Sequence, residues 1–178
     1  MLRLKNSFFI ILLGSLVFLS CYPQDVEPPF IGFDTESFNR EWTAWEAQGI
    51  TGYAVEEDVL IAGRRREIAH IVVRDNVIIQ HETLDRWDDI NEEDHLYHLY
   101  YTRGLLNEVR TISEIYAWVN RVYEEAVALY TDSNGRYGIQ IKITYNSRGF
   151  HYPQVVRISS MGDWGGALNC DLRLSKFQ

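Results

Sequence analysis

Residues 68–83 read Ile-Ala-His-Ile-Val-Val-Arg-Asp-Asn-Val-Ile-Ile-Gln-His-Glu-Thr, and this stretch decides the fold class. Its two halves are rich in β-branched residues, which favour extended strands. The dipeptide Asp75-Asn76 between them is typical of the two-residue turn that joins antiparallel strands. The stretch therefore predicts a β-hairpin whose strands cover 68–74 and 77–83.

A helix and a further strand are expected before this hairpin. The helix covers 35–48, because three aromatic residues recur on one face at i, i+4 and i+7: Phe38, Trp42 and Trp45. Asp34 or Thr35 is suited to cap its start, and Gly49 is suited to end it. The strand shows apolar residues in alternation: Tyr53, Val55, Val59 and Ile61. Residues 62–65 then turn the chain into the hairpin.

The second half of the chain follows a similar order. Thr111 and Glu114 fit a capping box at the start of the clearest helix. The apolar stripe of this helix is Ile115, Val119, Val122, Ala126 and Leu129. Strands are expected at 139–145, 154–159 and 168–174, after a loop at 132–135. A less regular helix between the two halves would begin at Asn91 and end at Gly104.

This order of elements predicts an α+β domain. Strands joined by short turns are antiparallel. The prediction is an antiparallel sheet of about six strands with two or three helices packed on one face. The opposite sheet face would stay open to solvent. Residues expected to face the helices are Ile139, Ile141, Ile143 and Tyr145, and those expected on the open face are Gln140, Lys142 and Thr144.

Length, composition and charge limit the class of protein. The chain has 178 residues, of which 46% are hydrophobic, so one domain with a buried core is expected. The formal net charge is −8. Because an acidic chain repels phosphate backbones, nucleic acid is not expected as a partner. No motif in the sequence indicates a cofactor, and none is expected.

Residues 1–20 have the pattern of an export signal. Arg3 and Lys5 precede the apolar run 8–19, which has the length of a signal peptide and is too short to span a bilayer. The run is followed by Ser20-Cys21. This ending resembles the bacterial lipobox, in which a small residue precedes the cysteine that receives lipid. The resemblance implies a lipoprotein anchored through acyl chains, such as palmitate, on Cys21, and the alternative is an ordinary signal peptide cleaved elsewhere.

A short tether is expected between the anchor and the domain. Residues 21–32 hold three of the four prolines, which predicts a stiff segment before a single domain at 33–178. Tyr22 follows the cysteine where Asp would retain a lipoprotein in the inner membrane, so the pattern resembles that of outer-membrane lipoproteins. Lipidation of Cys21 would leave Cys170 without an intramolecular disulfide partner. Cys170 is then expected to be a small buried hydrophobe.

Three segments of the chain share their order and spacing with a known family. They are Trp-Thr-Ala-Trp-Glu-Ala-Gln-Gly-Ile-Thr-Gly-Tyr at 42–53, Val-Val-Arg-Asp-Asn-Val at 72–77, and Ile-Thr-Tyr-Asn at 143–146 followed by Phe-His-Tyr-Pro. Together they resemble a bacterial secreted family known as domain of unknown function 6174. Asn146 replaces the usual Asp of that family, and His151 replaces the usual Gly. The resemblance covers roughly residues 38–177 and implies a secreted or lipoprotein domain, with no catalytic residues to carry over.

Histidine spacing suggests one candidate metal site. His95 and His98 lie one helical turn apart beside Asp94, and imidazoles with a carboxylate suit zinc. A third ligand would come from His81 or Glu82. The spacing differs from the His-Glu-x-x-His pattern of zinc hydrolases. Exposed polar residues on a helix are the simpler interpretation.

Two charged segments have both a functional and a simpler interpretation. The acidic run at 85–94 lacks the spacing of an EF-hand loop, so a solvated surface explains it better than calcium binding. Arg64, Arg65 and Arg66 lie at the expected hairpin tip. They would contact lipid headgroups or an acidic partner, or form an ordinary charged turn.

The function hypotheses follow from these features. No nucleophile motif is present, so the leading hypothesis is a non-catalytic envelope lipoprotein that binds a protein or another envelope component, and whether it is an enzyme stays open. The candidate binding residues are Trp164 in a glycine-rich loop and Lys142 and Arg157 on the open face. The alternatives are a metal-assisted hydrolase using His95 and His98 and a purely structural surface protein. The sequence does not indicate the oligomeric state.

Overall fold

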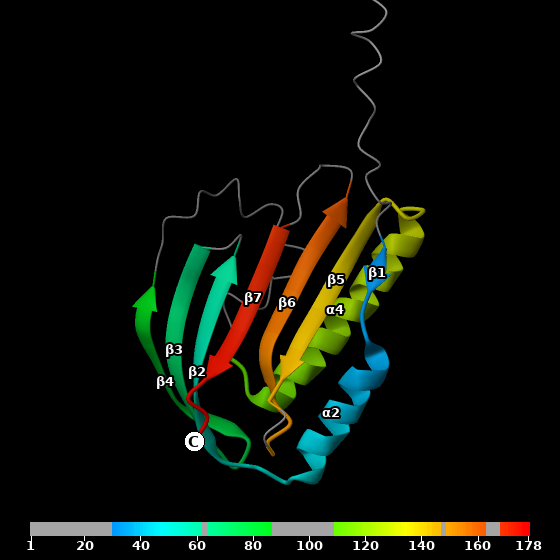
Figure 1. Ribbon diagram of the computed structural model, residues 1–178. Coiled ribbons are helices and arrows are strands. Elements are labelled where there is room, and N and C mark those ends of the chain that lie inside the picture. Colours follow the sequence, from blue (N-terminus) through cyan, green and yellow to red (C-terminus); the bar gives the residue numbers. More distant parts are fainter. Residues whose placement is uncertain (1–29, 62–63, 87–108, 147–148, 163–167) are drawn as a thin grey trace, which may run out of the picture.

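The computed structural model describes residues 30–61, 64–86, 109–146, 149–162 and 168–178. In this part of the chain, one sheet of seven strands is accompanied by helices α2 (Thr35–Ala47) and α4 (Ile112–Asp132). Helix α4 crosses one face of the sheet, and α2 packs against α4 near the β1–β5 edge (Figure 1). The α+β class is therefore confirmed. None of the described helices is long and apolar enough to cross a membrane.

The sheet differs from the predicted one in two respects. Its order is β1-β5-β6-β7-β2-β3-β4. The strands are β1 (Ile31–Gly32), β2 (Tyr53–Ile61), β3 (Arg64–Arg74), β4 (Val77–Arg86), β5 (Tyr137–Tyr145), β6 (Pro153–Gly162) and β7 (Leu168–Ser175). There are seven strands rather than about six, and the sheet is mixed rather than antiparallel, because β1 pairs with β5 in parallel.

Strand β1 could not be predicted from periodicity, because two residues are too few to show any. It lies in residues that were expected to end the tether. The pairing depends on a close approach of two backbones at Gly138, where an added Cβ would come within 2.4 Å of the Phe30 carbonyl oxygen. A glycine is required at that position.

The predicted hairpin is present and is longer than expected. Asp75 and Asn76 have φ of 52° and 61°, the left-handed values that a two-residue turn of this kind requires. Strand β3 begins at Arg64, so Arg64 and Arg65, predicted to lie in a turn, pair with Ile61 and Leu60 of β2. Strand β2 also pairs with β7, which joins the two halves of the chain in one sheet.

Both helices begin as their capping residues predict. Asp34 accepts a hydrogen bond from the Ser37 amide at 3.0 Å at the start of α2. In α4, the Thr111 hydroxyl accepts from the Glu114 amide at 3.2 Å, and the Glu114 carboxylate accepts from the Thr111 amide at 2.7 Å. This reciprocal pair is the predicted capping box.

Thr111→Ala should lower the free energy of unfolding by about 1 kcal/mol, because the Glu114 amide loses the Thr111 hydroxyl as its hydrogen-bond acceptor. Urea denaturation followed by circular dichroism measures the change. Thr131→Ala removes a hydroxyl from the exposed last turn of α4 and serves as the control, with little expected effect. Equal effects of the two substitutions would contradict the role of the cap.

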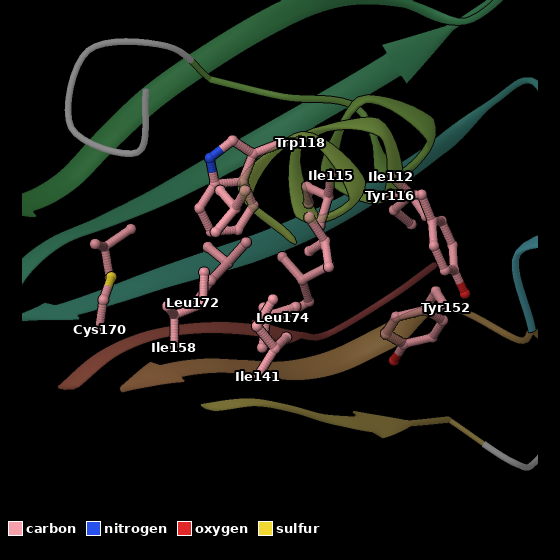
Figure 2. Packing of buried hydrophobic residues seen from close by; sticks show 14 of the residues in the cluster. Ile112, Ile115, Tyr116, Trp118, Ile141, Tyr152, Ile158, Cys170, Leu172 and Leu174 are labelled. Carbon is pink, nitrogen blue, oxygen red and sulfur yellow. The ribbon is translucent and has the colours of Figure 1, made fainter. Parts of the chain in front are cut away.

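The core lies between α4 and the sheet. Figure 2 shows α4 side chains, including Ile115 and Trp118, pointing toward residues of β5, β6 and β7. The helix-facing residues of β5 follow the prediction: Ile139 and Ile141 are buried, and Ile143 and Tyr145 pack against the core. On the opposite face, Lys142 and Thr144 are exposed and Gln140 is half-buried. No described helix covers that face (Figure 1).

Candidate functional site

The predicted site residues fall into two groups. Lys142 and Arg157 are described and lie on the open sheet face. The lipidation residue Cys21, the metal candidates Asp94, His95 and His98, and the loop residue Trp164 lie outside the described residues.

Lys142 and Arg157 stand directly opposite each other on neighbouring strands. Lys142 of β5 pairs in register with Arg157 of β6, and Arg157 pairs in register with Asp171 of β7. Residues opposite each other in a sheet point to the same face. Two cations and one carboxylate therefore form a row across the open face. Like charges in opposite positions destabilise a strand pair, so the Lys142–Arg157 juxtaposition is unfavourable for the sheet alone.

Asp171 is the centre of this cluster. Its carboxylate accepts two hydrogen bonds from the Arg157 guanidinium, at 2.7 and 2.6 Å, and a third from Arg173 at 3.1 Å. Its side chain is 8% exposed, against 47% for Arg157 and 44% for Arg173. Hydrogen bonding to Arg157 lowers the pKa of Asp171 despite its burial, and the same bonds raise the pKa of Arg157.

We call Lys142, Arg157, Asp171 and Arg173 the cationic row. It contains three cations and one carboxylate, on a chain with more acids than bases. Among the described residues Lys142 has no hydrogen-bond or ion-pair partner, whereas both arginines are held by Asp171. The row is therefore a fixed guanidinium pair beside a free ammonium group. Such an arrangement can receive the carboxylates or phosphates of a partner.

The open face carries charged side chains beside half-buried apolar ones, such as Leu60, Ile68 and Val72. Of the described side chains of β6 on this face, Arg157 and Ser159 are polar, and Val155 is apolar and half-buried. The other half of the face, formed by β2, β3 and β4, carries Glu56, Asp58 and Glu82. Positive and negative halves thus lie side by side on one sheet face.

A pocket lies beside the first turns of α4. Its volume is about 580 Å³, and it is lined by Val109, Arg110, Glu114, Ala117, Trp118 and Arg121. The Arg110 guanidinium lies 5.7 Å from the centre of the Trp118 ring, and Glu114 is already used in the capping box.

Glu57 is a buried acid on the helix-facing side of β2. Every second side chain of β2 is buried, and Glu57 is the acid among them, with 8% of its surface exposed. The other buried side chains of this strand are Tyr53, Val55, Val59 and Ile61. Burial raises the pKa of Glu57 to about 7; the charge of Arg110 opposes this rise and that of Glu67 adds to it. Glu67 in turn accepts a hydrogen bond from Thr83 at 2.9 Å and lies 3.5 Å from His81.

Two histidine–carboxylate pairs are present in the described chain. One is His81 with Glu67. The other joins His151 and Glu41 at 2.8 Å, and it lowers the pKa of Glu41. Neither pair has a third ligand: the described residues contain no group of three histidine, cysteine or acidic side chains that could hold a metal ion. The candidate third ligands His81 and Glu82 are on β4.

Cys170 lies in the core, as the sequence predicted. It is 3% exposed, and burial raises the pKa of its thiol to about 12. Because the thiolate is the reactive form, this cysteine is not activated for nucleophilic chemistry.

Sequence reasoning found part of the cationic row and missed the rest. Lys142 and Arg157 were selected from the strand alternation, whereas Asp171 and Arg173 were read only as part of an alternating strand. The Arg157–Asp171 contact depends on the register of β6 and β7, which the sequence does not state. Glu57 could have been recognised from the sequence, because it is an acid at a position where the other alternate residues of the strand are apolar.

A scan of the chain against models of known protein families found no match, and neither did searches of curated proteins and of solved structures.

Proposed function

We propose that this chain is a lipid-anchored protein of the bacterial envelope that binds an acidic segment of a partner protein through the cationic row. The observation that carries the proposal is the Lys142–Arg157 juxtaposition on an uncovered sheet face. A sheet gains nothing from two opposed cations, whereas a bound carboxylate would be stabilised by both.

The geometry supports recognition more than catalysis. Asp171 fixes the positions of Arg157 and Arg173, so the row loses little side-chain freedom when a partner binds. The row itself contains no serine, cysteine or histidine. Complementary charge also accelerates encounter and selects partners by sign, which suits a tethered adaptor.

The location of the protein is part of the same proposal. The lipobox-like Ser20-Cys21 supports an acyl anchor, and Tyr22 supports sorting to the outer membrane. Two acyl chains give stable attachment where one gives only reversible binding. The domain would then act as a binding module held at the membrane surface.

The binding surface can be tested with a polyglutamate peptide as the probe. Lys142→Gln with Arg173→Gln should weaken its affinity about tenfold, if each lost contact is worth about 0.7 kcal/mol as in exposed ion pairs. Isothermal titration calorimetry at low ionic strength measures the change. Arg157 is kept because it donates two of the three hydrogen bonds that Asp171 accepts, whereas Arg173 donates one.

The control removes the same charge elsewhere. Arg74→Gln with Arg121→Gln changes two exposed arginines that lie outside the cationic row, and it should leave the affinity nearly unchanged. If the two double variants lose affinity equally, binding depends on net charge alone, and the proposed surface is wrong.

A further inference from the structure

The pocket beside the first turns of α4 is a concave surface apart from the cationic row. Its volume of about 580 Å³ lies within the range of small-molecule sites, roughly 300–1,000 Å³. Val109 and Arg110 line it from the segment that leads into α4, and the helix contributes Glu114, Ala117, Trp118 and Arg121. The four helix residues are spaced at i, i+3, i+4 and i+7, so they share one face of α4.

Arg110 lines this pocket as a fixed group. Only 7% of the residue is exposed, and its guanidinium lies 5.7 Å from the centre of the Trp118 ring. A guanidinium at this distance is attracted by the ring face. Trp118 is itself 3% exposed and projects from α4 beside the sheet (Figure 2). The ring thus limits the movement of a side chain with five N–H donors, so little freedom is lost when that side chain binds an anion.

Arg121 supplies a second guanidinium from α4. It is exposed, and it forms no hydrogen bond or ion pair with a described residue. The other charged group of α4 in the described lining is Glu114, whose carboxylate accepts the Thr111 amide at 2.7 Å and is thereby fixed at the helix start. Each guanidinium can donate two parallel hydrogen bonds to a carboxylate, so the two arginines together suit the anionic group of a ligand.

We propose that this pocket binds a small organic carboxylate through Arg110 and Arg121. The hydrocarbon body of the ligand would lie against the apolar lining, which consists of Val109, Ala117 and Trp118. A planar carboxylate matches the fork of N–H donors of a guanidinium, which explains why arginine rather than lysine suits the site. This site is separate from the proposed function, because α4 and the cationic row lie on opposite faces of the sheet (Figure 1).

Glu57 links the site to pH. Burial raises the pKa of Glu57 to about 7, the charge of Arg110 opposes this rise, and that of Glu67 adds to it. Glu67 lies 3.5 Å from His81 of β4. Above pH 7 the Glu57 carboxylate competes with a bound anion for the charge of Arg110, whereas below it the Glu57 carboxyl is neutral. The affinity for a carboxylate should therefore increase as the pH falls through 7.

An NMR titration with phenylacetate and octanoate as probes tests the site. The protein is the chain from residue 21 carrying Cys21→Ser, so that no acyl chain contributes. Both acids should shift the backbone amide signals of Ala117 and Arg121, and the uncharged phenylacetamide and octanamide should shift them little. Arg121→Gln should weaken binding of the acids about fivefold, as expected for one exposed charged contact. Circular dichroism checks that each variant is folded.

Two further variants make the result specific. Arg136→Gln is the matched control, because it removes one exposed arginine beyond the far end of α4 and should leave the affinity unchanged. From about pH 8 to about pH 6 the affinity of the parent should rise about threefold, and Glu57→Gln should remove this rise. Glu67 and His81 are present in both proteins, so the difference between the two pH profiles isolates Glu57.

The proposal is overturned if neither acid shifts the signals of α4, or if the amides bind as tightly as the acids. Shifts confined to Lys142 and Arg157 would place the anion on the cationic row instead. Equal losses of affinity in Arg121→Gln and Arg136→Gln would show that overall charge attracts the probes. A pH profile that Glu57→Gln leaves unchanged would contradict the role of Arg110.

Discussion

Glu57→Gln should remove a pH dependence of stability worth about 3 kcal/mol between pH 4.5 and about pH 8. The pKa of Glu57 is about 7 in the folded protein, against 4.5 for an ordinary glutamate. Between these values the folded state holds a proton that the unfolded state has lost. The native protein is therefore stabilised by this group below pH 4.5, and this stabilisation is lost as the pH rises through 7.

Urea denaturation of both proteins across this pH range measures the effect. Asp171 and Glu41 have lowered pKa values, so their contributions have the opposite sign and are lost as the pH falls. These residues are present in both proteins, and subtracting one pH profile from the other isolates Glu57. Glu56→Gln, on the exposed side of the same strand, provides a matched control without this effect. Parallel profiles for Glu57→Gln and the native protein would show that Glu57 is not a buried acid.

Cys21→Ser should abolish incorporation of radiolabelled palmitate in the native host. The anchor depends on a thioether at this residue, and each buried methylene contributes about 0.8 kcal/mol to membrane attachment. The variant should therefore accumulate as unprocessed precursor or lose its attachment to the membrane. Metabolic labelling followed by gel electrophoresis measures the first effect, and detergent phase partitioning measures the second.

Cys170→Ala is the matched control for this labelling. It removes the other cysteine, which is buried in the core, and should leave the label in place. Label that persists in Cys21→Ser would mean that the lipid is attached at another residue, and a native chain that takes up no label would mean that the lipobox resemblance is misleading.

The elements with strong local signals were predictable from the sequence. The α4 capping box, the Asp75-Asn76 turn and the alternation of β5 depend on neighbouring residues, and the structure confirms all three. The open sheet face followed from the ratio of strands to helices. Each of these features is fixed by periodicity or by turn chemistry.

The features that escaped prediction depend on contacts between distant segments. Strand β1 exists because Gly138 allows a second backbone to approach, and two residues leave no pattern to read. The hydrogen bonds of Asp171 to Arg157 and Arg173 require the β6–β7 register.

Site-specific photocrosslinking in the native host tests the central claim most directly. A photoreactive residue at Thr144, on the open face beside Lys142, should capture a partner protein through an acidic segment. That crosslink should disappear when Lys142→Gln and Arg173→Gln are added. The same probe at Glu125, on the exposed side of α4, should capture nothing. Capture of the same partner at Glu125, or capture at Thr144 that survives the loss of both cations, would contradict the claim that the cationic row is the binding surface.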